Sequence, residues 1–189
     1  MIVQGVVDHR MRFLDVNIGW PGSCNDRRVL RNSGLYRLCQ GRDRLAGPAV
    51  EHMGLTILEY IVGHGGYVLL PWLMIPFQRP ELVSASHRTT RIIVERAFGG
   101  LKEMWKYVGG VIRNPNISTL PSAIHACCIL HNIMMDIDIE EEARPSFYIN
   151  DPLIDNPFLG DISGDIADTP EGIGARQELM EYLEMQEIC

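Results

Sequence analysis

Four possible zinc ligands, His125, Cys127, Cys128 and His131, lie within one short stretch of the sequence. On a helix, the i, i+3 spacings of His125 with Cys128 and of Cys128 with His131 place all three side chains on one face. Structural zinc sites usually include a CxxC pair, and no such pair accompanies these residues. Their neighbours include isoleucine and leucine, so the pattern favours a packed helix over a zinc site.

The acidic side chains offer a second kind of chemistry, because carboxylate oxygens bind hard cations such as Mg²⁺. Glu95 follows Arg91 by four residues on a helical pattern, which is the spacing of a surface ion pair. Asp8 and Asp15 flank a predicted hairpin turn, where aspartate is common. Asp26 lies at a predicted helix start, where a carboxylate is favourable. Each acid therefore has an ordinary structural explanation when it is taken alone.

Charge is divided unequally along the chain. Residues 1–135 carry 15 Lys and Arg against 9 Asp and Glu, whereas residues 136–189 carry 2 against 15. Thirteen of the 15 cations in the first part are arginine, the side chain best suited to bidentate phosphate contact. Two interpretations stay open: a solvated surface beside an acidic tail, or a phosphate-facing body whose tail screens it or recruits a basic partner.

Length and composition predict one globular domain in a reducing compartment. The 189 residues are 46% hydrophobic and 22% charged, an ordinary balance for a globular protein. The five cysteines are an odd number, so free thiols fit better than a disulfide framework. No uninterrupted apolar run reaches the roughly 18 residues of a membrane helix, and no secretory signal pattern is present. We therefore expect no membrane partner.

The elements that would position these side chains follow from the hydrophobic periodicity. Residues 2–8 and 13–19 are two β-rich runs, and they predict a hairpin. The apolar spacing over residues 25–38 predicts a helix, with Ser23 or Asn25 as its N-cap.

The middle of the chain predicts one strand and two longer helices. Residues 55–62 predict a buried strand that stops at the glycine-rich turn 63–67. Residues 85–108 predict a helix. Its apolar stripe, with a 4-3-4-3 spacing, consists of Val94, Phe98, Leu101, Trp105 and Val108. A second helix is predicted from Ser118 or Thr119 to about residue 135, with a proline in its first turn.

Composition changes after residue 135. Asp, Glu, Pro and Gly dominate residues 136–174, which predicts an extended acidic tail. Residues 175–189 predict a short amphipathic helix that docks back on the body. The side chains expected to dock are Leu179, Tyr182 and Leu183.

Five segments together resemble the PIF/Harbinger transposase family and its host-domesticated nuclease-like relatives. They are VD at 7–8 with RFLD at 12–15, GWPGS at 19–23 with Asp26 and RVL at 28–30, GHGGY at 63–67 with LPWL at 70–73, RIIVERAFG at 91–99 with LK at 101–102, and CCILHN at 127–132. Their order and spacing over residues 2–135 make the set specific. The resemblance implies an α/β, RNase H-like (DDE transposase) fold: a mixed sheet with three antiparallel strands, followed by parallel strands that alternate with helices.

The resemblance also implies a catalytic site of three acids: an Asp on the first strand, an Asp in a Gly-Asp-x-x-Tyr turn, and a Glu on the following helix. Three are needed because two divalent cations, Mg²⁺ or Mn²⁺, lie about 3.5–4 Å apart at the scissile phosphate. Such hard cations prefer carboxylate oxygens, one of which usually bridges them. One acid cannot replace three.

By the resemblance, this chain keeps one of those acids. Glu95 matches the helix glutamate, and its place off the apolar stripe suits a site that faces a cleft. His64 replaces the aspartate of the turn, and imidazole has a single lone pair that cannot bridge two Mg²⁺ ions. We interpret His64 as a decayed position, with a repurposed single-metal site as the alternative. Asp26 is also matched by the family and is a second candidate metal ligand, although a helix-capping role competes with it.

The resemblance further implies that the first, central strand is missing, because residues 2–8 match the family's second strand. Two neighbouring strands would then have to pair directly or leave backbone groups exposed. We expect residues 1–135 to be a partial domain and the chain to be a fragment of a longer product.

The implied function is that of a nuclear, transposase-derived protein that does not hydrolyse DNA and acts by binding DNA or a partner protein. In similar proteins a separate Myb/SANT-like chain supplies DNA binding and nuclear import, and some plant relatives act with chromatin complexes. No helix-turn-helix or zinc finger is evident in this sequence. The candidate DNA contacts are Arg91, Arg96 and Lys102. Two alternatives stay open: an active metal-dependent endonuclease and a non-functional gene fragment.

Overall fold

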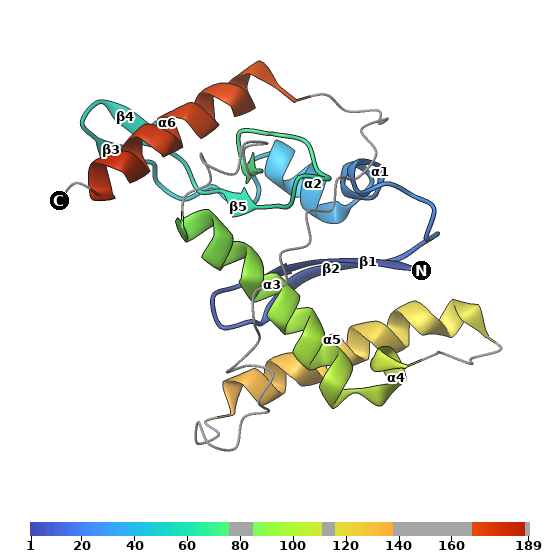
Figure 1. Ribbon diagram of the computed structural model, residues 1–189. Coiled ribbons are helices and arrows are strands. Elements are labelled where there is room, and N and C mark those ends of the chain that lie inside the picture. Colours follow the sequence, from blue (N-terminus) through green and yellow to red (C-terminus); the bar gives the residue numbers. More distant parts are fainter. Residues whose placement is uncertain (76–84, 111–115, 138–167, 188–189) are drawn as a thin grey trace. The chain divides into compact units, whose positions relative to one another are not determined.

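The computed structural model describes residues 1–75, 85–110, 116–137 and 168–187, and its chain divides into two compact units (Figure 1). We call residues 1–24 with 88–157 the hairpin unit, and residues 25–87 with 158–189 the turn unit. Each unit is described by itself below.

The hairpin unit begins with the predicted hairpin, which is confirmed. Strands β1 (Ile2–Val7) and β2 (Phe13–Trp20) pair antiparallel. Asp8 closes the turn between them: its Oδ1 accepts the backbone N–H groups of Arg10 and Arg12 at 2.9 and 3.0 Å, and its Oδ2 accepts Arg12 Nε at 2.9 Å. Burial opposes ionisation of Asp8, but these hydrogen bonds outweigh it and hold its pKa below the ordinary value. The predicted turn role of Asp8 is confirmed.

The helices of the hairpin unit are α3 (Ala85–Met104), α4 (Lys106–Gly109), the 3-10 turn η2 (Ile117–Thr119) and α5 (Leu120–Asp136). The prediction of one continuous helix over 85–108 is wrong, because the backbone of Trp105 leaves the helical region at φ −111° and ψ 88°. Its N–H still reaches Leu101 O, and its carbonyl accepts the N–H groups of Val108 and Gly109. The break therefore keeps the chain compact, and Trp105 and Val108 stay packed on the core.

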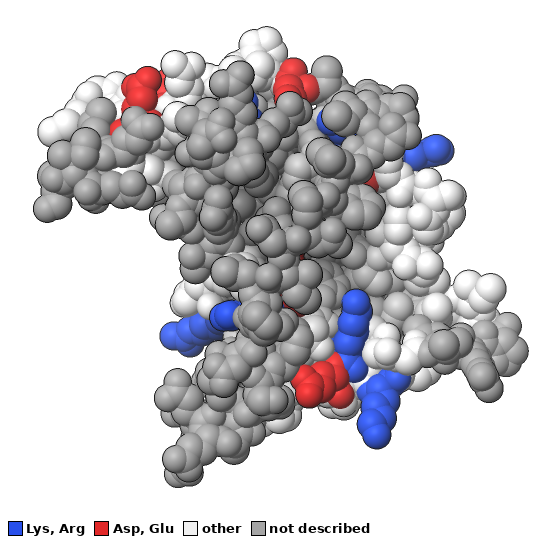
Figure 2. All heavy atoms as spheres, in the orientation of Figure 1, with Lys and Arg blue, Asp and Glu red and all other residues white. Residues whose placement is uncertain are grey.

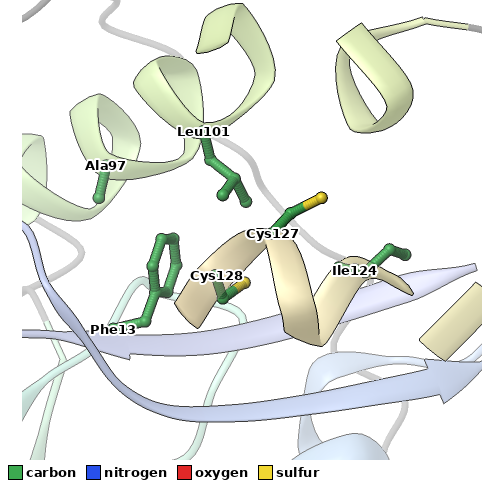
Figure 3. Close-up of a cluster of buried hydrophobic side chains, with 6 residues drawn as sticks. All are labelled: Phe13, Ala97, Leu101, Ile124, Cys127 and Cys128. Carbon is green, nitrogen blue, oxygen red and sulfur yellow. The ribbon is translucent and has the colours of Figure 1, made fainter. Parts of the chain in front are cut away.

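An apolar cluster of described residues holds this unit together (Figure 3). Its buried members are Phe13, Ala97, Leu101, Ile124, Cys127 and Cys128. Because the two cysteines belong to this core, the packed-helix interpretation of the 125–131 segment is confirmed. Burial raises the pKa of the Cys128 thiol to about 11, so the thiolate form that binds metal ions is disfavoured.

Helix α5 is tied to β2 by polar side chains as well as by the core. The Asn132 side chain accepts the N–H of Phe13 at 2.7 Å and donates to its carbonyl at 2.8 Å. His131, with no exposed surface, bonds through Nε2 to Met11 O at 2.9 Å. Met11 has φ 64°, an unfavourable value for this residue type. These bonds therefore fix the hairpin turn on the helix.

The turn unit begins with two short helices in place of the single predicted one, which corrects the prediction over 25–38. They are α1 (Asp26–Arg31) and α2 (Gly34–Gln40). Buried Ser33 causes the break, since its hydroxyl donates to Leu30 O and accepts the N–H of Tyr36. A serine with this geometry caps a new helix. The predicted cap Asn25 is confirmed, because its Oδ1 accepts Arg28 N–H at 2.8 Å.

The predicted strand over 55–62 is also wrong as a single strand. Strand β4 (Leu55–Ile57) pairs with β3 (Val50–His52) through a two-residue turn, Met53 and Gly54, both with positive φ. Strand β5 (Ile61–Val62) instead pairs in parallel with β6 (Leu73–Met74). Such a turn favours a local hairpin over one extended run. The described residues thus contain three two-stranded sheets.

The predicted docking of the last helix is confirmed, although α6 (Pro170–Glu187) begins earlier than expected. Leu179 is buried with Leu69, Met74 and Ile75, and Tyr182 and Leu183 pack against this cluster. Two hydrogen bonds to the Leu69 backbone also anchor its start: the Asp168 side-chain Oδ1 accepts Leu69 N–H at 2.9 Å, and Thr169 N–H donates to Leu69 O at 3.1 Å. The amphipathic pattern alone did not predict these hydrogen bonds to Leu69.

The segment Ile117–Asp136 is long and apolar enough, by length and composition, to cross a membrane. A single helix of this kind is weak evidence, because core helices pass the same test. Here the helix carries the bonds to Met11 and Phe13 described above. The expectation of no membrane partner stays a prediction.

Candidate functional site

The glycine-rich turn Gly63–Tyr67 directly follows β5 and is closed by a bond from Tyr67 N–H to His64 O at 3.2 Å. Strand β5 is held by its parallel partner, through bonds from Ile61 N–H to Trp72 O and from Gly63 N–H to Met74 O. The turn therefore begins where a hydrogen-bonded strand ends. Functional side chains of α/β proteins often lie at such a position.

Both nitrogens of the His64 imidazole face a defined neighbour. Its Nδ1 accepts the backbone N–H of Gly66 at 3.0 Å. Its Nε2 lies 3.7 Å from Oδ2 of Asp26. The Tyr67 ring lies beside it, with centroids 4.6 Å apart and planes tilted by 46°. The ring is thus oriented by its own turn and by helix α1.

Asp26 occupies the first position of α1, and the structure brings it together with His64. Helix capping, the competing role for Asp26, is performed by Asn25 instead. The side chains of Asp26 and His64 are 31% and 39% exposed, so this pair lies at a surface that solvent reaches. Two of the candidate site residues are therefore neighbours in space.

Hydrogen bonding identifies which nitrogen of His64 carries the proton. A nitrogen that accepts an N–H must present a lone pair, so Nδ1 is unprotonated. In the neutral imidazole the proton then lies on Nε2, directed at the Asp26 carboxylate. Metal-bound histidines have the opposite arrangement, in which the non-ligating nitrogen donates its N–H to an acceptor. The donor set of Asp26 and His64 does not fit a pair of Mg²⁺ ions.

Glu95, the match to the family's helix glutamate, is exposed on α3 in the hairpin unit. Of the candidate DNA contacts, Lys102 is exposed on the same helix. Arg96 has a buried Nε with no hydrogen-bond partner. Arg91 lies on α3, but its side chain falls outside the described residues. On the face drawn in Figure 2, the described Lys and Arg side chains stand among acidic and uncharged ones.

Gly66 is a site residue that sequence reasoning did not single out. A Cβ at this position would lie 2.7 Å from both Asp26 Oδ2 and His64 Cε1. Glycine therefore permits the close approach of the two side chains. The signal was present in the paired glycines of the GHGGY turn, but the sequence does not say which residues approach them.

A separate cavity of about 120 Å³ lies elsewhere in the turn unit, and its lining includes Arg42, Glu59 and Trp72. Neither His64 nor Asp26 lines it. Among the described residues, no group of three or more His, Cys, Asp or Glu side chains is placed to hold a metal ion.

The sequence matches a family model described as the DDE superfamily endonuclease over residues 1–132. This range contains the turn, α1 and Glu95. In this family the chemistry generally depends on divalent metal ions. No solved structure matches the chain at a comparable level of significance.

Three relatives illustrate the similarity. The Arabidopsis thaliana protein named ALP1-like is 43% identical over 145 residues, covering 73% of this chain and 36% of the relative. Antagonist of Like Heterochromatin Protein 1, also from Arabidopsis thaliana, is 38% identical over 143 residues, covering 72% and 36%. HARBI1 of Homo sapiens, whose name includes the word nuclease, is 26% identical over 147 residues, covering 74% and 39%. The match thus spans well under half the length of each relative.

Proposed function

Because this chain belongs to the DDE superfamily endonuclease family, we propose that it is a Harbinger-type, transposase-derived protein that acts in the nucleus by binding DNA or a partner protein, without hydrolysing DNA. Membership rests on the family match over residues 1–132 and on the relatives above. What is proposed is the mode of action, and its support is the geometry of His64 and Asp26.

The observation that carries the proposal is the pair of neighbours that the two nitrogens of the His64 imidazole face. Hydrolysis by two metal ions needs carboxylates that bind and bridge both cations. At the family's turn position this chain has a ring whose Nδ1 accepts the Gly66 N–H and whose Nε2 faces Asp26. A neutral imidazole has a single lone pair, and here it accepts the Gly66 N–H, so this side chain does not take over the role of a carboxylate that bridges two cations.

The finer fold is part of the proposal. We infer an RNase H-like fold, for which the hairpin unit supplies an antiparallel strand pair, β1–β2, and the turn unit supplies a parallel strand pair, β5–β6. Support comes from the family membership and from the presence of both pairing types.

Without hydrolysis, the proposed function is binding to DNA or to a partner protein. The excess of arginine in residues 1–135 suits phosphate contact, and Lys102 is exposed on α3. The second relative is named as an antagonist of a heterochromatin protein, which supports chromatin as the setting. A Myb/SANT-like protein or a chromatin complex is the partner class that the resemblance suggests, with sequence reading left to that partner.

A nuclease assay tests the loss of hydrolysis. The whole chain is incubated with supercoiled DNA and Mg²⁺ or Mn²⁺, both alone and lengthened at its start with the upstream segment of the ALP1-like relative. We expect no cutting by either form. The alternative function, a metal-dependent endonuclease, predicts cutting that disappears in Glu95→Ala.

His64→Asp is the informative variant of that assay. If it cuts DNA in the lengthened chain while the parent does not, then loss of the turn carboxylate is the cause of inactivity. Cutting by the unmodified chain that depends on Glu95 would overturn the proposal. A protein that cannot be obtained as a soluble, cooperatively melting chain would favour the remaining alternative, a non-functional fragment.

A further inference from the structure

We propose that His64 fastens the Gly63–Tyr67 turn directly to helix α1 through Asp26, so that a side-chain contact and not a metal ion holds this corner of the turn unit. This inference goes beyond the proposed function, because it assigns a structural role to the substituted residue whether or not the chain binds DNA. His64 is on this account a positioning residue.

His64 contacts two elements at once, its own turn and helix α1. Nδ1 holds the turn's own backbone by accepting Gly66 N–H at 3.0 Å. Nε2 faces Asp26 Oδ2 at 3.7 Å, on the first residue of α1. This distance is longer than a hydrogen bond, and the attraction is the electrostatic one between Nε2–H and the carboxylate, which holds even when the imidazole is neutral. The ring therefore bridges the turn and the helix.

This bridge excludes a cation. To bind a metal through Nε2, the imidazole must move its proton to Nδ1. Nδ1–H would then face the N–H of Gly66, two donors against each other, and the 3.0 Å bond would be lost. Direct contact with Asp26 and metal binding are thus alternatives, and the hydrogen bond from Gly66 favours direct contact.

The two side chains also lie close together. A Cβ on residue 66 would lie 2.7 Å from Asp26 Oδ2 and from His64 Cε1, so the side chains close over the glycine. Tyr67 covers the ring on another side, with centroids 4.6 Å apart. The contact is therefore packed by the turn as well as directed by charge.

Substitutions at position 64 separate this role from a metal-binding one. Asparagine keeps one contact, because its Oδ1 takes the place of Nδ1 and can accept Gly66 N–H, whereas its amide nitrogen falls short of the Nε2 position that faces Asp26. Alanine removes both contacts. Aspartate keeps the acceptor but places two carboxylates together, which repel until a cation binds between them.

The experiment is a thermal melt of the whole chain and its variants at neutral pH, with EDTA or with millimolar Mg²⁺ or Mn²⁺. We expect His64→Asn, which keeps only the Gly66 contact, to melt between the parent and His64→Ala. His64→Ala should melt roughly 2 to 4 °C lower, as for the loss of one modest contact in a chain of this size. His64→Asp should melt lowest in EDTA and gain several degrees with Mn²⁺, through mass action on a newly formed site.

Metal ions also bind weakly to acidic residues elsewhere, so the decisive quantity is the metal-induced shift of each variant minus that of His64→Asn. The proposal is overturned if the parent shows a larger metal-induced shift than His64→Asn and loses it in Asp26→Asn. It is also overturned if His64→Ala melts with the parent. DNA cutting by the parent would contradict the proposed function instead, so the two failures can be told apart.

Discussion

Two histidines, one in each unit, use hydrogen bonds to backbone groups in opposite ways. His131 in the hairpin unit has no exposed surface and bonds to the carbonyl of Met11 at 2.9 Å, with the Phe13 ring 5.2 Å from its own. His64 in the turn unit is 39% exposed and accepts an N–H. The first histidine is therefore required by the core, whereas the second lies at a surface position where the chain would also fold with other residues.

The largest effect is expected at the buried histidine. His131→Ala should lower the free energy of unfolding by about 3 kcal/mol, because it empties a core position and leaves Met11 O without its partner. Urea denaturation followed by circular dichroism measures it. His64→Ala is the matched control and should cost about 1 kcal/mol. Equal losses at the two positions would contradict the comparison.

A second expected loss lies in the turn unit, where α6 is anchored. Gly172→Ala would place a Cβ 2.8 Å from Leu69 O, so the start of α6 must move, which disturbs the hydrogen bonds of Asp168 and Thr169 to the Leu69 backbone. We expect a loss of about 2 kcal/mol. Gly174→Ala is the control, since nothing lies within 4 Å of its added Cβ. Faster hydrogen exchange at Leu69 in the first variant only would confirm the anchor.

The two histidines should also differ in how pH acts on stability. Burial lowers the pKa of His131, and the Met11 bond opposes this only in part. The unfolded chain therefore binds more protons than the folded chain below the ordinary histidine pKa of about 6.5. Its contribution to stability is complete above that value and is lost as pH falls below it. The slope between about pH 7 and pH 5 should shrink in His131→Gln and persist in His125→Gln, an exposed histidine on the same helix.

The smallest expected effect concerns the binding surface. Lys102→Glu should weaken binding to DNA several-fold at low salt and reduce the salt dependence by about one released counterion or more. Fluorescence anisotropy with a labelled duplex at several salt concentrations measures both quantities. Arg37→Glu, the same charge change on an exposed residue of the turn unit, is the control. An equal response from both variants would argue against a specific role for Lys102.

Much of the fold could be predicted from periodicity, because regular apolar spacing reflects burial. The β1–β2 hairpin, the Asn25 cap and the docking of Leu179 are examples. The errors arose where a polar side chain or a turn ended an apolar pattern early. Ser33 started a new helix inside a continuous pattern, and the predicted strand over 55–62 was divided because β4 pairs with β3 across the Met53–Gly54 turn whereas β5 pairs with β6.

The site was predictable in part. Motif spacing identified His64, Asp26 and Glu95 as the residues to examine. It could not predict the approach of Asp26 to His64, because packing brings together two segments that are distant in the sequence. Nor could spacing assign the imidazole proton, which depends on the backbone N–H of Gly66.

The position of the His64 proton can be measured directly. It follows from the nitrogen chemical shifts of the imidazole, recorded by NMR on ¹⁵N-labelled protein at a pH where the ring is neutral. His64→Asn assigns the signal. We predict protonated Nε2, unprotonated Nδ1 and no change on adding Mg²⁺. A ring with its proton on Nδ1, or an Nε2 signal that shifts with Mg²⁺, would show a metal-binding histidine and contradict the central claim.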